Sequence, residues 1–369
     1  MFEEIISLIT YNNKCRRNNI LYQKFRKGYN FMDLSVLFFA FFSGIVGSAL
    51  GPVMSFVMCG LWGMVAVVGV AASSSFNFLA LFPLGPFFGP HVAFGGAVAA
   101  LSYASYKGYV EDGRNIVMPL MGVGKADVLL IGGIFGVLGH FFKFLTEYFL
   151  PGKVDPIALS ILITACIAKL MFDKSHKVIS SRPEKEKSIG SRFSSKLEST
   201  WVPQMRPPLM MTILALGIGG IVSYAMSLML GNPEVGNIAA ALMFLMFAVP
   251  FILFLIGLPA PVCHHIAIGA GYGTAASGGS ILWGIAGAII FCYAAELLSR
   301  IFWSYGDTWV DPPATGVVFG SFILLGVLPA FNYYSFDLYI LPSLIIGVSL
   351  IYSFNAQKKL DEYNVETAA

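Results

Sequence analysis

Two short motifs each occur twice in this chain, and the duplication limits its architecture more than any other feature. The motif HVAFG at residues 91–95 returns as HIAIG at residues 265–269, 174 positions later. The motif VDPIA at residues 154–158 returns as VDPPA at residues 310–314, 156 positions later. Aliphatic matches are common by chance in an apolar chain, but a repeated His and a repeated Asp-Pro are not. The sequence therefore predicts two internal repeats, which membrane proteins commonly pack about a pseudo-symmetry axis.

The composition places these repeats in a membrane. Hydrophobic residues make up 57% of the chain and charged residues 12%, with a mean hydropathy of +0.75, whereas charged residues reach about 25% in soluble domains. Apolar runs of roughly 20 residues recur, the length that crosses a hydrocarbon core of about 30 Å. The runs are continuous and lack the alternation of a membrane barrel. We therefore expect an all-α, polytopic helical protein in contact with the lipid bilayer.

The apolar runs and charges divide the chain into six parts, with about five membrane segments in each repeat. The expected order is a basic cytosolic arm, membrane repeat one, a basic cytosolic linker, membrane repeat two, an extra transmembrane helix and a polar tail, at residues 1–30, 31–172, 173–206, 207–335, 336–354 and 355–369.

The arm and the linker carry most of the 23 Lys and Arg residues. By the positive-inside rule, both segments are expected in the cytosol and the protein in the cell membrane. The linker interleaves its positive charges with Glu184, Glu186 and Glu198, so no nucleic-acid partner is expected.

Each repeat contains an apolar segment that is interrupted by Gly and Pro, at residues 84–90 and 257–261. Pro removes a helical hydrogen bond, and irregular backbone at membrane depth is tolerated only inside protein or beside a water-filled cavity. Both places predict broken or re-entrant helices. If the arm and the linker lie on one side, repeat one crosses an even number of times, which favours a re-entrant segment and parallel repeats. Inverted repeats with five full crossings each stay open.

The repeated histidines are the first candidates for a substrate pathway. His91 and His265 each follow a break and open a run of small residues that includes Gly95 and Gly269. A broken helix exposes N–H groups and a positive dipole end that can hold an anion or a polar solute. The structural alternative is that each ring hydrogen-bonds a loose carbonyl at the break.

A second pair lies deeper in apolar runs. His140 and Glu296 each precede a repeated Asp-Pro by 15 residues. An ionisable residue inside a membrane is a functional candidate by default, so both are assigned to the pathway. The charges that follow them are spaced to pair along one helix face and are interpreted as structural: Lys143, Glu147 and Arg300.

Asp155 and Asp311 have a structural explanation. Asp followed by Pro before an apolar run is typical of a helix N-cap with Pro at the first helical position. We therefore expect both to cap helices.

Metal, cofactor and catalytic motifs do not emerge. His264 adjoins His265, but adjacent side chains diverge and Pro90 occupies the equivalent place in repeat one. No HExxH, GxSxG or Asp-rich metal motif occurs, so neither a metal, a cofactor nor an enzymatic activity is expected.

The duplication therefore favours a transporter or channel that moves a small solute or ion between two pseudo-symmetric repeats. The alternatives are a non-transporting subunit or scaffold of a larger membrane complex and, third, a membrane-embedded enzyme. Each of these three functions is compatible with a homo-oligomer.

Overall fold

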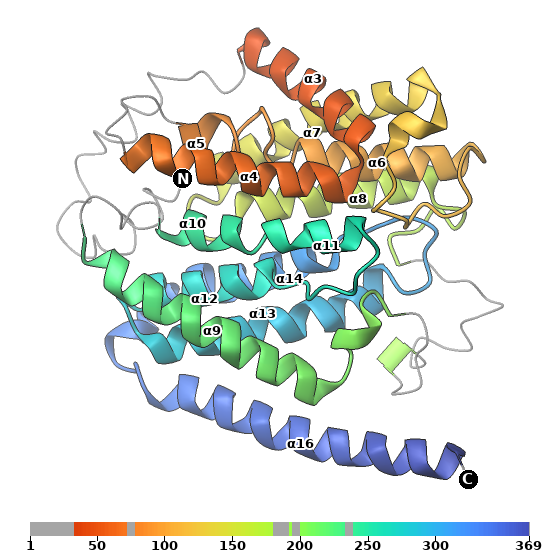
Figure 1. Cartoon of the computed structure of the whole chain (residues 1–369). Helices are drawn as coiled ribbons and strands as arrows, with labels where there is room; N and C mark the ends of the chain where they lie inside the picture. Colours follow the sequence, from red (N-terminus) through yellow and green to blue (C-terminus); the bar gives the residue numbers. More distant parts are fainter. Residues whose placement is uncertain (1–32, 72–77, 180–191, 194–199, 233–238, 369) are drawn as a thin grey trace.

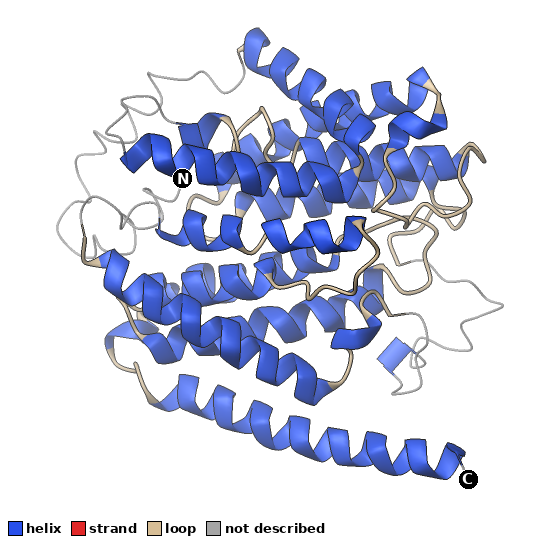
Figure 2. Ribbon diagram, viewed as in Figure 1, coloured by secondary structure: helices blue, strands red, loops and turns tan. Residues whose placement is uncertain are grey.

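The computed structural model describes residues 33–71, 78–179, 192–193, 200–232 and 239–368 (Figure 1). The basic arm and much of the linker lie outside the described residues. Within the described ranges the regular structure is helical (Figure 2), apart from an isolated β-bridge between Gly113 and Thr308. The predicted all-α class is confirmed.

The described helices lie mainly within the two predicted membrane repeats and the part that follows them. The helices before the linker are α3 (Leu34–Leu50), α4 (Pro52–Ala71), α5 (Phe78–Leu81), α6 (Ala93–Tyr106), α7 (Ala126–Phe149) and α8 (Pro156–Phe172). The helices after it are α9 (Pro208–Leu230), α10 (Ala239–Met246), α11 (Ile252–Leu255), α12 (His264–Ala276), α13 (Ile281–Phe302), α14 (Pro312–Ser321), α15 (Leu328–Ala330) and α16 (Ile340–Ala368). A π-helical turn, Phe322–Val327, joins α14 to α15. Single turns of 3-10 helix lie at Leu120–Val123, Pro203–Met205, Val249–Phe251 and Tyr333–Ser335.

We call α3 to α8 the first half and α9 to α15 the second half. The helix is interrupted in both halves where Gly and Pro cluster, over residues 82–92 (the first break) and 256–263 (the second break). The first break closes on itself through backbone bonds such as Gly89 N to Gly85 O, 3.0 Å. Gly257 turns the second break with a φ of 77°, which glycine adopts without steric penalty.

In the first half, α7 packs antiparallel to α3, α6 and α8. Cβ atoms added at Gly132 and Gly136 would overlap α3 near Gly44 and Ala40, so the two chains run in opposite directions. The same Gly132 approaches α6 at Gly96. On the α8 side, the Ser160 hydroxyl donates to the Gly139 carbonyl at 2.5 Å. Small residues let these backbones approach closely, as is common in membrane helix packing.

In the second half, α13 occupies the corresponding central place. It packs antiparallel to α9, where Tyr293 donates to the Pro208 carbonyl at 3.1 Å and Gly284 approaches Ser223. It crosses α12 with the backbones of Gly287 and Gly269 in contact, and it also packs on α14. The central helices of the two halves therefore have corresponding neighbours: α7 packs on α3, α6 and α8, and α13 packs on α9, α12 and α14.

The two halves meet along α4 with α10 and along α8 with α14. The C-terminal ends of α8 and α13 lie together, because the Lys169 ammonium donates to the Phe302 carbonyl at 2.9 Å. Since α7 is antiparallel to α8, α7 and α13 run in opposite directions (Figure 1). The other matching helices, such as α3 and α9, are opposed in the same way.

These directions correct one expectation. The broken segment from α5 to α6 continues across the molecule instead of returning, so the first half makes five passes. The start of α3 and the end of α8 lie at opposite faces of the molecule (Figure 1). The prediction that the arm and the linker share one side required an even number of passes and does not fit this path. We call the face at the end of α8 the linker face.

Six of the described helical segments are long and apolar enough to cross a membrane: Pro52–Gly69, Ala126–Phe149, Pro208–Leu230, Ile281–Phe302, Pro312–Ala330 and Ile340–Glu362. Large apolar side chains are exposed on the outer helices, for example Phe42 on α3, Ile221 on α9 and Ile351 on α16, at 57%, 67% and 65%. Such continuous apolar faces suit contact with lipid.

The helix α16 includes both the expected extra transmembrane helix and the expected polar tail. Asp337 starts it, because its carboxylate accepts backbone N–H bonds from Tyr339, Ile340 and Leu341 at 2.7 to 3.0 Å. The Asp337 carbonyl accepts from the Trp283 indole at 3.0 Å, which ties α16 to α13. Desolvation alone would raise the pKa of the Asp337 carboxyl, but these N–H donors outweigh it and lower the pKa.

The glycine crossing between α3 and α7 predicts a position-specific cost. We expect Gly44→Ala to lower the free energy of unfolding by roughly 1–3 kcal/mol, because its Cβ would overlap the Gly132 backbone and overpacked cores lose about this much. Gly220→Ala on α9 is the control, since nothing lies within 4 Å of a Cβ there. Denaturation in detergent micelles measures both; equal stability of the two variants would contradict the packing described.

The cap of α16 predicts a pH dependence. Because the pKa of Asp337 is lowered in the folded protein, its stabilising contribution is present above the ordinary carboxyl pKa of about 4 and is lost as the pH falls through the folded value. We expect Asp337→Asn to flatten the decrease in Tm below this pH. An unchanged slope in detergent melts would refute this role.

Candidate functional site

A cavity of about 240 Å³ lies between the two halves. The first half contributes walls from α4, the first break, α6 and α8, and the second half contributes walls from α10, the 3-10 turn after it, α12 and α14. We call this the central cavity. Its position between the halves is where transport sites of repeated membrane proteins commonly lie.

The central cavity is lined by matching positions in and next to the two motif copies. The pairs at the 174-residue offset are Pro90 with His264 and Phe94 with Ile268. The pairs at the 156-residue offset are Asp155 with Asp311, Ile157 with Pro313, Ala158 with Ala314 and Ile161 with Val317.

The cavity extends from the linker face into the interior. Asn115 and Val117, from the loop between α6 and α7, are exposed and line its outer end. This loop is held against the second half by the bridge between Gly113 and Thr308. The inner end contains buried residues such as Leu84 and Ile157. The wall therefore changes from accessible to buried along its length.

Asp155 connects the halves at the inner part of the cavity. It begins α8, and its Oδ1 accepts from the Ala158 backbone N–H at 2.8 Å. Its Oδ2 accepts from the Tyr272 hydroxyl of α12 at 2.5 Å, and its own N–H donates to the Ser321 hydroxyl of α14 at 3.0 Å. One residue thus caps a first-half helix and holds two second-half helices.

Asp311 is placed in the same way at the start of α14. Its Oδ2 accepts from the Ala314 backbone N–H at 2.8 Å, and its Oδ1 accepts from the Trp309 indole at 3.0 Å. Asp155 and Asp311 are both buried, at 7% exposure. Each carboxylate oxygen has a second lone pair, so capping leaves acceptor capacity on both.

His264 lies in an aromatic wall of the cavity. Its ring centroid is 4.7 Å from Phe56, 5.1 Å from Phe251 and 6.2 Å from Phe244. The residue is 8% exposed, and its Nδ1 has no hydrogen-bond partner among the described residues. Sequence reasoning set His264 aside because Pro90 is its counterpart, yet both positions line the cavity.

His91 and His265 lie one residue beyond this wall and are absent from the cavity lining. Both are fully buried, and neither ring has a hydrogen-bond partner in the described part of the chain. His91 stacks on His140 with centroids 5.9 Å apart, and His265 faces Trp201 at 6.0 Å. Each ring therefore contacts its own half, and a pathway role for the two stays a prediction.

The glycines assigned to the pathway have packing environments. Gly95 lies in ordinary contact with Thr164 of α8, and Gly269 forms the crossing with α13 described above. Both are outside the cavity lining.

The Glu296 carboxylate forms an ion pair with Arg300 on the same helix. Its Oε1 accepts from the Arg300 guanidinium at 2.9 and 3.0 Å, and its Oε2 accepts from the Trp201 indole at 3.1 Å. On α7, Lys143 pairs with Glu147 at 2.6 Å, close to the buried His140. The spacing therefore predicted both ion pairs, and neither His140 nor Glu296 lines the central cavity.

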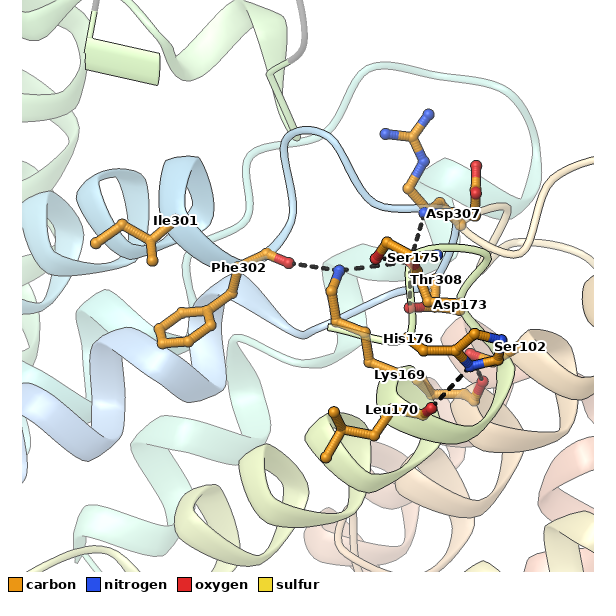
Figure 3. Close-up of polar contacts among 12 residues, drawn as sticks. Ser102, Lys169, Leu170, Asp173, Ser175, His176, Ile301, Phe302, Asp307 and Thr308 are labelled. Carbon is orange, nitrogen blue, oxygen red and sulfur yellow. Dashed lines mark hydrogen bonds and ion pairs between the residues drawn. The ribbon is translucent and has the colours of Figure 1, made fainter. Parts of the chain in front are cut away.

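A buried polar cluster joins the halves at the linker face (Figure 3). Asp173 Oδ2 accepts from the Asp307 backbone N–H at 2.8 Å and lies 3.7 Å from the Lys169 ammonium. Asp173 Oδ1 accepts from the Ser175 hydroxyl at 2.6 Å. The side chains of Lys169 and Asp173 are 0% and 1% exposed. Lys169 and Asp173 are spaced to pair along one helix face, whereas the bond from Lys169 to the Phe302 carbonyl joins positions 133 apart and follows no local pattern.

A match to a known protein family covers both halves of the chain. Residues 27–341 match the model of a family of unknown function, DUF7973. The chain belongs to this family. No curated protein and no solved structure matches the chain. The DUF7973 match spans both halves and both breaks, so the central cavity lies entirely within it.

The Lys169–Asp173 cluster of this DUF7973 protein predicts a stability effect. We expect Asp173→Asn to lower the free energy of unfolding by about 3 kcal/mol, because it leaves the buried Lys169 charge uncompensated. Adding Lys169→Met should restore part of the loss. Asp112→Asn is the control, since its pair with Arg114 is 54% exposed on the Asp112 side and such pairs contribute at most about 1 kcal/mol. Equal losses at both aspartates in detergent denaturation would contradict the prediction.

Proposed function

We propose that this protein is a membrane transporter that carries a small solute through the central cavity. The observation that carries the proposal is that matching residues of the two motif copies line one cavity, with a buried carboxylate from each half. In repeated transporters, substrate sites lie at the interface of the repeats.

The proposal takes the two halves as inverted repeats. The support is that corresponding helices have the same neighbours but run in opposite directions, as α7 and α13 do. Inverted repeats allow two alternative states. A movement of one half that opens the cavity to one face has an equivalent in the other half that opens the cavity to the opposite face. A solute that binds both states then shifts between faces as their populations change.

The present cavity is accessible from the linker face and ends in buried side chains. Asp155, bonded to Tyr272 and Ser321, lies at this inner part. A site open on one side favours a transporter over a continuously open channel. It also favours transport over a scaffold role, for which a cavity between the halves has no use.

We assign the linker face to the cytoplasm and the protein to the cell membrane. Besides the linker, this face carries positive residues of the loop between α6 and α7 and of the end of α16: Lys107, Arg114, Lys125, Lys358 and Lys359. The positive-inside rule favours the cytosol for the more basic side. The start of α3 is then extracytoplasmic.

Transport is tested by flux into proteoliposomes across a panel of cationic, anionic and neutral small solutes. We expect saturable uptake of at least one class, reduced at least tenfold by Asp155→Asn or Asp311→Asn, since uncharged Asn still caps a helix. The control is Asp33→Asn, which changes the exposed cap of α3. No uptake of any solute by wild type, or full uptake by both cavity variants, would overturn the proposal.

A further inference from the structure

We infer that the solute of the central cavity is a small organic ammonium ion with an apolar body. The inference rests on the proposed function and names its substrate class. It is drawn from the charge, the aromatic walls and one unpartnered ring nitrogen of the cavity.

The two buried charged residues of the described lining are both acidic, with Asp155 in the inner part and Asp311 nearer the linker face, four residues after Asp307. Asp155 and Asp311 are at 7% exposure, whereas Arg114, the cation of the described lining, is at the outer end. The Arg114 guanidinium lies 4.7 Å from the Trp303 ring centre and 3.4 Å from Asp112. It is therefore engaged outside the buried part. An anionic solute would meet a buried carboxylate from each half in the lining, whereas Lys143, the buried cation whose charge reaches Asp155, pairs with Glu147 and is absent from the lining.

The remaining walls are largely aromatic and aliphatic, with aromatic side chains from both halves: Phe56, Phe94, Phe244, Phe251, Phe254 and Trp309. Aromatic faces attract organic cations, and the attraction is stronger where the cation is desolvated. A hard metal cation would instead need six or more oxygen ligands. Two carboxylates among rings fit an ammonium group with an apolar body better than an inorganic ion.

His264 provides an independent sign of a missing partner. Its ring is inside the aromatic wall, and Nδ1 has no hydrogen-bond partner among the described residues. A buried polar atom without a partner is costly. In the neutral ring this nitrogen can accept an N–H bond, which a protonated amine supplies and a carboxylate does not; because the atom is buried, the ring must turn toward the cavity for a solute to reach it.

The volume limits the size of the solute. At about 240 Å³ the cavity is smaller than the ~300–1,000 Å³ of drug-sized sites. A single ring with a short aminoalkyl chain is of suitable size.

The test uses three probes with the same phenyl body and different charge: 2-phenylethylammonium, 2-phenylethanol and 3-phenylpropanoate. Binding to the purified full-length protein in detergent is followed by titration calorimetry and by tryptophan fluorescence, because Trp201 and Trp309 line the cavity. We expect the ammonium probe to bind at least tenfold more tightly than the alcohol, and the carboxylate to bind weakest. Equal affinities, or tighter binding of the carboxylate, would overturn the inference.

The variants locate the binding. Asp155→Asn and Asp311→Asn should each weaken the ammonium probe at least tenfold and leave the alcohol nearly unchanged, while Asp33→Asn changes neither. The affinity for the alcohol reports whether each variant is folded, and the wild-type probe series decides the question without any variant. Undiminished ammonium binding in both cavity variants would also refute the inference.

The binding and flux results separate the two proposals. Ammonium-selective binding without uptake would refute transport and leave the cavity chemistry standing. Saturable uptake of an anionic or neutral solute through the cavity, without ammonium selectivity, would support transport and refute the substrate class.

Discussion

A helix that breaks at membrane depth leaves backbone N–H and C=O groups that lipid cannot satisfy. The described part of this chain contains two helix breaks, and each is packed against protein. The first break bonds to itself and to α3, where the Ser43 hydroxyl donates to the Phe87 carbonyl. The second break is in contact with the 3-10 turn at Pro203–Met205, where the Gln204 amide donates to the Ala260 carbonyl at 3.3 Å. The central cavity follows from this arrangement, because the residues next to both breaks face each other across it.

The same arrangement explains why polar groups are found in an apolar interior. Asp155 and Asp311 satisfy the first turns of α8 and α14, and Asp155 also orders Tyr272 and Ser321 of the other half. At the linker face, Lys169 and Asp173 fasten the end of α8 to the end of α13. The halves are therefore joined by two buried polar contacts at different depths, and α4 and α10 contribute walls to the cavity between them. A change between two accessible states would require at least one of these contacts to rearrange.

Local patterns in the sequence predicted the local structure well. Apolar runs predicted the all-α class, Gly and Pro predicted both breaks, and Asp-Pro marked the starts of α8 and α14. The direction in which each helix crosses the molecule was harder to predict from the sequence. Counting basic residues in the arm and the linker favoured parallel repeats, because the positive-inside rule weighs charge and carries no information on whether a broken segment continues or returns.

The site illustrates the same limit. His91 and His265 were singled out because histidine is rare, but packing places them one residue outside the cavity, and the lining positions are Pro90 and His264. Asp155 and Asp311 were interpreted as caps, and they do accept the capping N–H bonds; their place in the cavity wall depends on contacts between halves that no local pattern encodes. Their occurrence in both motif copies was the available signal.

The central claim is that two oppositely directed halves enclose the cavity, and membrane topology tests it most directly. Single cysteines at Ser35 and Lys174, both partly or fully exposed positions at the two ends of the first half, are introduced after replacing the five native cysteines. A membrane-impermeant maleimide is then applied to right-side-out and inside-out vesicles. The account predicts that the two positions react in opposite preparations, with Lys174→Cys labelled from the cytoplasmic side. Labelling of both from the same side would mean an even number of crossings and would contradict the inverted arrangement.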